Sequence, residues 1–146
     1  MKFTCTVEIN RPKEKVVALW KNQNNLKHWQ EGFERYEHLS GEKETVDSKG
    51  ILHYITRGNA MELEETILEW NLPDVMEGRY VHDKMTNRMR NTFQGLGTEK
   101  TLWKAEINYT QFNGFKMKLL GFLGKRIFKQ QTQKWLNNFK KFAETT

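Results

Sequence analysis

Four glutamates close together form the densest group of side chains in this chain that could do acid–base chemistry. They lie in the stretch MELEETILEW, residues 61–70, at Glu62, Glu64, Glu65 and Glu69. Side chains alternate between the two faces of a strand, so Glu65 and Glu69 are predicted to share a face with the apolar residues of this stretch, Met61, Leu63 and Ile67. If that face lines a cavity, burial would raise the pKa of a glutamate and suit it to general acid or base catalysis.

Alternation allows a second assignment of the same strand. In that assignment Glu62, Glu64 and Leu68 point inward, and the pattern alone does not choose between the two faces. The simplest interpretation of either is a strand face on which the glutamates meet solvent or pair with lysines. Glu65 is therefore a candidate for proton transfer on condition that its face lines a cavity.

The other residues that often carry catalysis or bind metals are scattered. The four histidines form no close pair and stand at His28, His38, His53 and His82. Metal sites need several convergent ligands, so we expect neither a metal nor another cofactor. His53 and His82 fall on predicted strands and could face a common interior, which makes His82 a second candidate for proton transfer. Cys5 alternates with polar neighbours on an apolar strand face and is expected to behave as a small hydrophobic side chain.

Short alternating segments predict the sheet that would position these residues. Strands joined by tight turns, such as one at Gly58-Asn59, favour an antiparallel meander. The predicted order is one strand, two short helices, six strands and one long helix. The expected bounds are 2–9 for the first strand, 13–22 and 24–29 for the short helices, and 33–43, 50–57, 61–70, 75–83, 88–96 and 100–112 for the later strands.

The long helix is predicted to follow Gly124, after which neither glycine nor proline occurs. One largely aromatic stripe keeps helical spacing over about five turns, through Phe128, Thr132, Trp135, Phe139 and Phe142. Either this stripe fills a solid core or it roofs a cavity. Glycines at positions 114, 121 and 124 indicate that residues 114–124 form a broken or flexible segment leading into the helix, and so a candidate gate.

The net charge of +6 belongs to the carboxy-terminal segment. Residues 114–146 contain eight Lys or Arg and one Glu, so they carry +7 and residues 1–113 carry −1. A solvated helix face is the simplest explanation, and docking on an acidic partner or a membrane surface is the alternative. No nucleic-acid-binding signature accompanies the charge, and no nucleic-acid partner is expected.

Length and composition predict one domain, residues 1–146, that can bury a sizeable core without disulfides. No apolar run reaches the roughly 18 residues that a transmembrane helix needs, and the first residues lack the apolar core of a signal peptide. With a single cysteine, the protein is expected to be cytoplasmic. We expect it to be a monomer or homodimer without stable membrane insertion.

Two stretches together are typical of a known superfamily. In VEINRPKEKVVALWKNQNNLKHWQEGF, residues 7–33, a strand ends at a proline turn, and a Val-Trp helix and an Asn-Leu-x-x-Trp segment follow. The second stretch is the glycine-containing approach to the long helix. Both resemble START-like (SRPBCC, polyketide cyclase/dehydrase-type) helix-grip domains. The resemblance implies an α+β fold in which a seven-stranded curved antiparallel sheet wraps around the C-terminal helix, with two short helices after the first strand and a hydrophobic cavity inside.

The resemblance also implies a function. Members of the superfamily bind lipids, sterols, polyketides or aromatic compounds, and a minority catalyse cyclisation or dehydration without a shared catalytic motif. We therefore expect a hydrophobic or aromatic small molecule to bind between the sheet and the C-terminal helix, in contact with large amphipathic side chains. The candidates are Tyr54, Tyr80, His82, Met89, Asn91, Phe93, Trp103, Phe128, Trp135 and Phe139. The alternatives are a cyclase, dehydratase or hydrolase that uses His82 or Glu65 in the same cavity, and an interaction protein that docks through the basic C-terminal helix.

Overall fold

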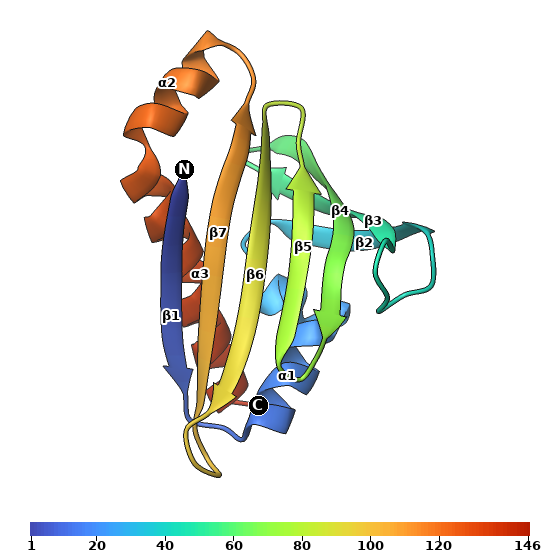
Figure 1. Cartoon of the computed structure of the whole chain (residues 1–146), viewed down its shortest axis with the longest axis vertical. Helices are drawn as coiled ribbons and strands as arrows, with labels where there is room; N and C mark the ends of the chain where they lie inside the picture. The colour runs from blue at the N-terminus through green and yellow to red at the C-terminus, as the bar shows by residue number, and fades with distance from the viewer.

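The computed structural model describes residues 1–146 and contains seven strands and four helical segments (Figure 1). The strands are β1 (Lys2–Ile9), β2 (Phe33–Ser40), β3 (Lys49–Thr56), β4 (Asn59–Asn71), β5 (Val75–Val81), β6 (Met85–Gly95) and β7 (Thr101–Phe112). The helical segments are α1 (Lys13–Lys21), the 3-10 helix η1 (Gln23–His28), α2 (Phe115–Leu123) and α3 (Lys125–Glu144). The predicted order of elements is confirmed, and α2 is an additional helix within the segment predicted to be broken.

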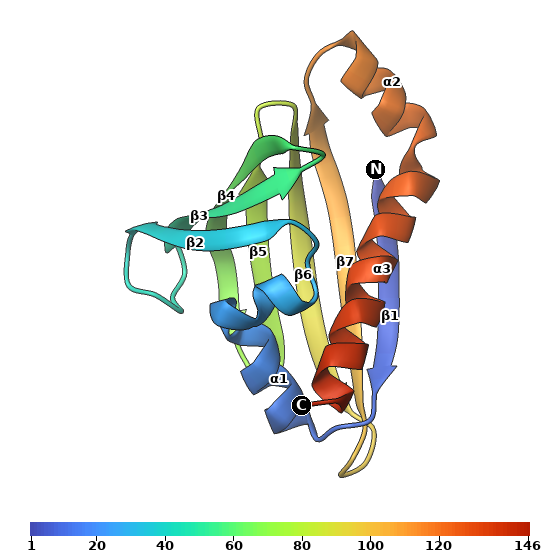
Figure 2. The same ribbon diagram turned by 180° about the vertical axis from the view of Figure 1, so that it is seen from behind.

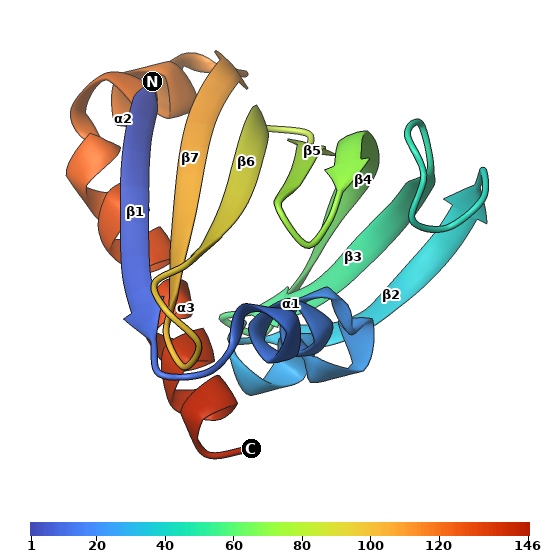
Figure 3. The ribbon, with the colours of Figure 1, turned by 60° about the horizontal axis from the view of Figure 1, so that its bottom comes forward.

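All seven strands form one antiparallel sheet in the order β1-β7-β6-β5-β4-β3-β2. Only the pairing of β1 with β7 joins strands that are distant in the sequence. The sheet bends so strongly that β2 and β3 run across the direction of β5, β6 and β7, while α3 lies along the concave side (Figure 2). The short helices α1 and η1 close one end of this concave side (Figure 3). The predicted α+β helix-grip fold is confirmed.

The hairpin between β3 and β4 shows how local chemistry sets the strand register. Its two central residues are Arg57 and Gly58, both in the left-handed region with φ of 52° and 79°. Two such residues form the tight turn whose twist matches that of the flanking strands. Thr56 pairs with Asn59 across this turn, so the turn lies one residue earlier than the Gly58-Asn59 dipeptide predicted.

A β-bulge in β4 changes which glutamates point inward. Glu65 pairs with Tyr80, but the register shifts between Ile67 and Glu69, so that Glu69 pairs with Glu77. The extra residue reverses the alternation, and Glu69 reaches the outer face of the sheet. The prediction that Glu65 and Glu69 share a face is therefore wrong, because alternation alone does not detect a bulge.

The solid core occupies the end of the molecule that α1 and η1 close. Thirteen buried residues cluster there between β1, β6, β7 and the C-terminal half of α3. Trp103 and Phe139 are fully buried at the centre, 5.4 Å apart between ring centroids and edge to face. Trp29 packs edge to face against both, which is a favourable arrangement for aromatic rings.

The helical segment after β7 breaks at Gly124. A side chain at this position would meet the carbonyl oxygen of Leu120, so glycine is needed where α2 turns into α3. None of the helices combines the length and the apolar composition that crossing a bilayer requires. Whether residues 114–124 act as a gate remains a prediction.

Candidate functional site

A cavity of about 640 Å³ lies between the concave face of the sheet and the N-terminal half of α3. Eighteen of its 30 lining residues are hydrophobic. The lining residues come from the inward faces of β3 to β7, from α1, η1 and the turn after η1, and from α3. The cavity exists because the bent sheet is too wide for one helix to cover. The volume falls within the roughly 300–1,000 Å³ typical of small-molecule sites.

The α3 stripe divides between the cavity and the core. Phe128, Thr132 and Trp135 line the cavity, whereas Phe139 and Ala143 are fully buried in the core. Both interpretations of the stripe therefore hold, each for one half of the helix. Leu136 lies at the boundary, fully buried and also part of the cavity wall.

Aromatic rings form the two ends of the α3 wall. Trp135 stacks on Tyr54 with ring centroids 6.1 Å apart and an angle of 15° between their planes. Phe128 packs on Tyr109 at 4.7 Å. Burial raises the pKa of Tyr109 to about 12, as expected for a phenol in an apolar wall.

The polar part of the cavity is centred on Glu65. Its carboxyl group lines the cavity, and burial raises its pKa, an effect that a hydrogen bond with the Tyr80 hydroxyl offsets in part. No lysine, arginine or histidine forms an ion pair with Glu65, whereas its outward neighbour Glu64 approaches Lys49 at 4.0 Å. Removing water without supplying a cation disfavours the charged carboxylate, so burial shifts Glu65 toward its protonated form.

Three tyrosines surround this carboxyl. Burial and the nearby Glu65 charge raise the pKa of Tyr54, Tyr80 and Tyr36 above the ordinary phenol value. The Tyr54 hydroxyl donates a 2.6 Å hydrogen bond to the side-chain oxygen of Gln30. Phenols with raised pKa values stay protonated, so the group offers neutral hydrogen-bonding partners rather than charges.

Glycines leave the space for two of these rings. A Cβ atom at Gly78 would stand 2.7 Å from the Tyr80 hydroxyl oxygen, and one at Gly50 would overlap the Tyr36 ring. Each tyrosine ring therefore lies across a strand position that has no side chain. This explains why glycine occurs inside strands, where it is otherwise unfavourable.

Six of the ten predicted ligand contacts lie on the cavity wall: Tyr54, Tyr80, Met89, Asn91, Phe128 and Trp135. Phe93, Trp103 and Phe139 are instead buried in the core cluster. His82 lies between β5 and β6, where its Nδ1 accepts a hydrogen bond from the Lys84 backbone N–H at 3.1 Å. The structure thus gathers the first six around one space and leaves the last four outside it.

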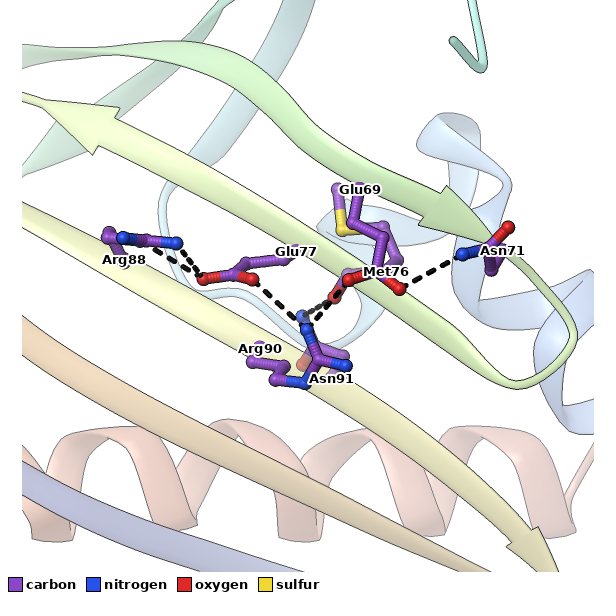
Figure 4. A network of polar contacts seen from close by, with 7 residues as sticks. All are labelled: Glu69, Asn71, Met76, Glu77, Arg88, Arg90 and Asn91. Atoms are coloured by element: carbon purple, nitrogen blue, oxygen red, sulfur yellow. Dashed lines mark hydrogen bonds and ion pairs between the residues drawn. The ribbon is translucent and has the colours of Figure 1, made fainter. Parts of the chain in front are cut away.

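Asn91 lines the cavity with its polar groups already engaged. Its Oδ1 accepts a 3.0 Å hydrogen bond from Trp103 Nε1. Its Nδ2 donates to the Met76 carbonyl at 3.4 Å (Figure 4). Arg90, the preceding residue, points to the other face of the sheet and bridges Glu69 and Glu77 at 2.8 and 3.2 Å. Asn91 is therefore a link between cavity wall and core rather than a free polar handle.

His53 and His82 do not share an interior. His53 Nε2 lies 2.9 Å from Glu37 and its Nδ1 lies 3.4 Å from Glu62, and Glu62 is exposed. The same Nδ1 atom of His82 lies 2.8 Å from Asp83 Oδ1. The expectation of a common interior is wrong. Side chains alternate along β3, so His53 points to the face of the sheet opposite to the one that carries Leu52 and Tyr54. No three His, Cys, Asp or Glu side chains are grouped so that they could hold a metal ion.

Several cavity residues were not predicted from the sequence. They are large apolar side chains on strands and on the short helices, namely Trp20, Leu26, Met61, Leu63, Trp70 and Met76. Alternation could have supplied Met61 and Leu63, which share the face of Glu65. Trp70 was hidden by the bulge, because strict alternation from Glu65 places it on the outer face.

Three of the cavity-lining tryptophans have polar atoms without partners. The indole N–H groups of Trp20, Trp29 and Trp135 are buried and make no hydrogen bond. Buried donors of this kind are rare and each costs about 1–3 kcal/mol. The three side chains belong to α1, to the turn after η1 and to α3, which all contribute to the cavity wall.

Comparison with known proteins rests on structure, since no family model and no curated protein matches the chain. The Zhui aromatase/cyclase from Streptomyces superposes with a TM-score of 0.79 at 12% identity, covering 99% of this chain and 93% of its own. A START superfamily protein from Mycobacterium smegmatis gives 0.67 at 13% identity, covering 99% and 94%. A conserved protein from Geobacillus kaustophilus gives 0.80 at 12% identity, covering 99% and 96%.

These similarities extend over nearly the full length of each chain, and at such low identity they define the fold. The chain has the helix-grip fold of START-like proteins, which confirms the resemblance found in its sequence.

Proposed function

We propose that this protein binds a hydrophobic or aromatic small molecule in the cavity between the sheet and α3. The observation that carries the proposal is the cavity itself, about 640 Å³ of space with mostly apolar walls. Protein interiors are normally packed to the density of organic crystals. A large apolar space is therefore costly unless another molecule fills it.

The polar groups narrow the class of ligand. Glu65 and Tyr80 lie together in the wall with no cation nearby, which disfavours an anionic group at that end. A ligand oxygen that reached one of the buried indole N–H groups of Trp20, Trp29 and Trp135 would supply the hydrogen-bond partner that these groups lack. A largely apolar molecule with hydroxyl or carbonyl groups, such as a polyketide-like aromatic compound or a sterol, fits both features.

Thermal unfolding in the presence of candidate ligands tests the proposal. A ligand at one hundred times its Kd adds about 2.7 kcal/mol to the free energy of unfolding, which corresponds to a rise in Tm of roughly 5–10 °C for a domain of this size. The probes are palmitate, cholesterol and 1-naphthol, chosen to represent a fatty acid, a sterol and an oxygenated aromatic compound.

A cavity-filling variant provides the control. Leu63→Trp/Met89→Trp places two large rings in the cavity and should abolish the rise in Tm, while Leu39→Trp, at an exposed position on β2, should leave it unchanged. The proposal fails if none of the three probes stabilises the wild-type protein, or if the filled variant responds as the wild type does.

Catalysis in the same cavity is the second candidate, and Glu65 is the observation in its favour. A neutral carboxyl beside Tyr80 could protonate a hydroxyl leaving group or a carbonyl, as a dehydratase or cyclase requires. Glu65→Gln would then abolish turnover of a bound ligand while leaving its affinity intact, and His82→Gln would have no effect. Full turnover in Glu65→Gln would eliminate this candidate.

A further inference from the structure

The outer surface of α2 is the most apolar exposed feature of the molecule. Phe115 and Phe122 are 83% and 84% exposed, and Leu119, Leu123 and Ile127 are exposed beside them. At about 100° per residue, the four α2 side chains fall within an arc of about 100° on one side of the helix. Soluble proteins rarely expose apolar side chains in such a contiguous group without a partner.

Lysines flank this apolar face on both sides. On the same helical projection Lys116 follows Leu123 at one edge, and Lys118 precedes Phe122 at the other. Lys125, Arg126 and Lys129 continue the positive charge into α3, and all five cations are exposed and form no ion pair. No Asp or Glu occurs from residue 107 to residue 143, so no acidic side chain of the same segment neutralises them.

The inward side of α2 is tied to the cavity. Gly121 packs so closely on Phe112 that a Cβ atom would stand 2.6 Å from its ring. Phe112 in turn stacks on Tyr109, with 5.6 Å between ring centroids, and contacts Phe128. Tyr109 and Phe128 both line the cavity. A partner bound to the outer face of α2 would therefore be separated from the cavity wall by α2 itself and the Phe112 side chain.

We propose that α2 and the first turn of α3 dock the protein peripherally on an anionic lipid surface. An apolar helix face bordered by lysines matches an interfacial helix, whose apolar side chains enter the acyl boundary while lysines reach the headgroups. The helix stands at one extremity of the molecule (Figures 1 and 2), where a planar surface can approach it. The proposal does not depend on the cavity being occupied.

Charge argues against a second copy of the chain as the occupant of this face. A symmetric dimer through α2 would place five uncompensated cations of one copy against the same five of the other, and like charges at close range are repulsive. An anionic bilayer supplies the complementary charge over the whole face.

Vesicle flotation tests the assignment. At low ionic strength the protein should float with phosphatidylcholine vesicles that contain phosphatidylserine and not with pure phosphatidylcholine vesicles. Lys116→Gln/Lys118→Gln should weaken binding on the order of 10-fold or more, because each lysine near an anionic surface contributes about one kcal/mol. Raising the salt to about 1 M should have a similar effect, since the Debye length then falls to about 3 Å.

Matched variants distinguish specific vesicle binding through α2 from non-specific binding through other exposed side chains. Phe115→Ser/Phe122→Ser should lose vesicle binding at least about 10-fold with unchanged Tm, because both side chains are already exposed. Leu39→Ser/Val46→Ser, also at exposed apolar positions, and Lys43→Gln/Lys100→Gln should bind as the wild type does.

Three results would overturn the proposal. These are absence of flotation with anionic vesicles, equal loss of binding in the control variants, and a concentration-dependent dimer that Phe115→Ser/Phe122→Ser dissociates. The last result would assign the face to a second copy. Ligand-induced changes in Tm are measured separately, so failure of vesicle binding and failure of ligand binding are distinguishable.

Discussion

The chemistry of the cavity is concentrated at Glu65. Its carboxyl is the acidic group placed among three tyrosines with no cation to stabilise its charge. Desolvation raises its pKa above the ordinary glutamate value of about 4.3. A residue of this kind weakens the fold when it ionises, and natural proteins keep such residues where a function requires them.

This predicts a pH dependence that the variant Glu65→Gln should remove. Because the folded-state pKa is raised, the contribution of Glu65 is fully present below the unfolded-state pKa and is lost as pH rises through the folded-state pKa. Relative to Glu65→Gln, the wild type should therefore lose stability as pH increases above about 4.3, with a slope of at most about 1.4 kcal/mol per pH unit. Urea unfolding across this pH range measures the difference.

Glu62→Gln is the matched control, since Glu62 lies on the same strand and is exposed on the outer face. Any pH dependence that Glu62→Gln shares with Glu65→Gln is not due to burial of the Glu65 carboxyl. Equal pH profiles for Glu65→Gln and the wild type would show that Glu65 is not desolvated in the folded protein.

Helix α3 has two structural roles along its length. Its C-terminal half packs into the core through Phe139 and Ala143, and its N-terminal half leaves Phe128 and Trp135 facing a space. This division arises because α1 and η1 close only one end of the concave side of the sheet, the end at which the C-terminal half of α3 lies.

Alanine substitutions one turn apart on α3 should therefore separate stability from binding. Phe139→Ala should cost about 3–5 kcal/mol of unfolding free energy, as expected for a fully buried aromatic side chain. Trp135→Ala should cost less, since it enlarges an existing cavity, but should abolish the rise in Tm caused by ligands. Chemical denaturation and ligand-induced melting shifts check the two effects, and a larger loss of stability in Trp135→Ala would contradict the division.

The strand pattern predicted the sheet because β-branched, aromatic and polar residues alternate along each strand, and turns are marked by glycine, asparagine or proline. It predicted the wrong face for Glu69 and gave no signal for Trp70, because the bulge between Ile67 and Glu69 arises from pairing with β5. Phe93, Trp103 and Phe139 lie in the core, whereas Tyr54 and Trp135 line the cavity. Only three-dimensional packing separates the two groups. Both groups are large aromatic side chains that follow the periodicity of their strand or helix.

At the scale of the whole molecule, the apolar cavity and the charged exterior are separate. Nearly all excess positive charge lies in residues 114–146, but part of the basic face of α3 is already satisfied. Lys140 pairs with Glu144 at 2.6 Å and Lys134 pairs with Glu31 at 2.7 Å. Apart from Lys141, the cations of this segment without an ion pair lie on α2 and at the start of α3, which places the candidate docking surface at one end of the molecule.

Native mass spectrometry measures directly whether the cavity holds one apolar molecule. After incubation with the ligand that gives the largest thermal shift, the wild-type protein should carry one ligand per chain. Leu63→Trp/Met89→Trp should carry none, and Phe115→Ser/Phe122→Ser should carry one, because α2 lies outside the cavity. A wild-type protein that stays ligand-free, or a filled variant that binds the same single ligand, would contradict the account.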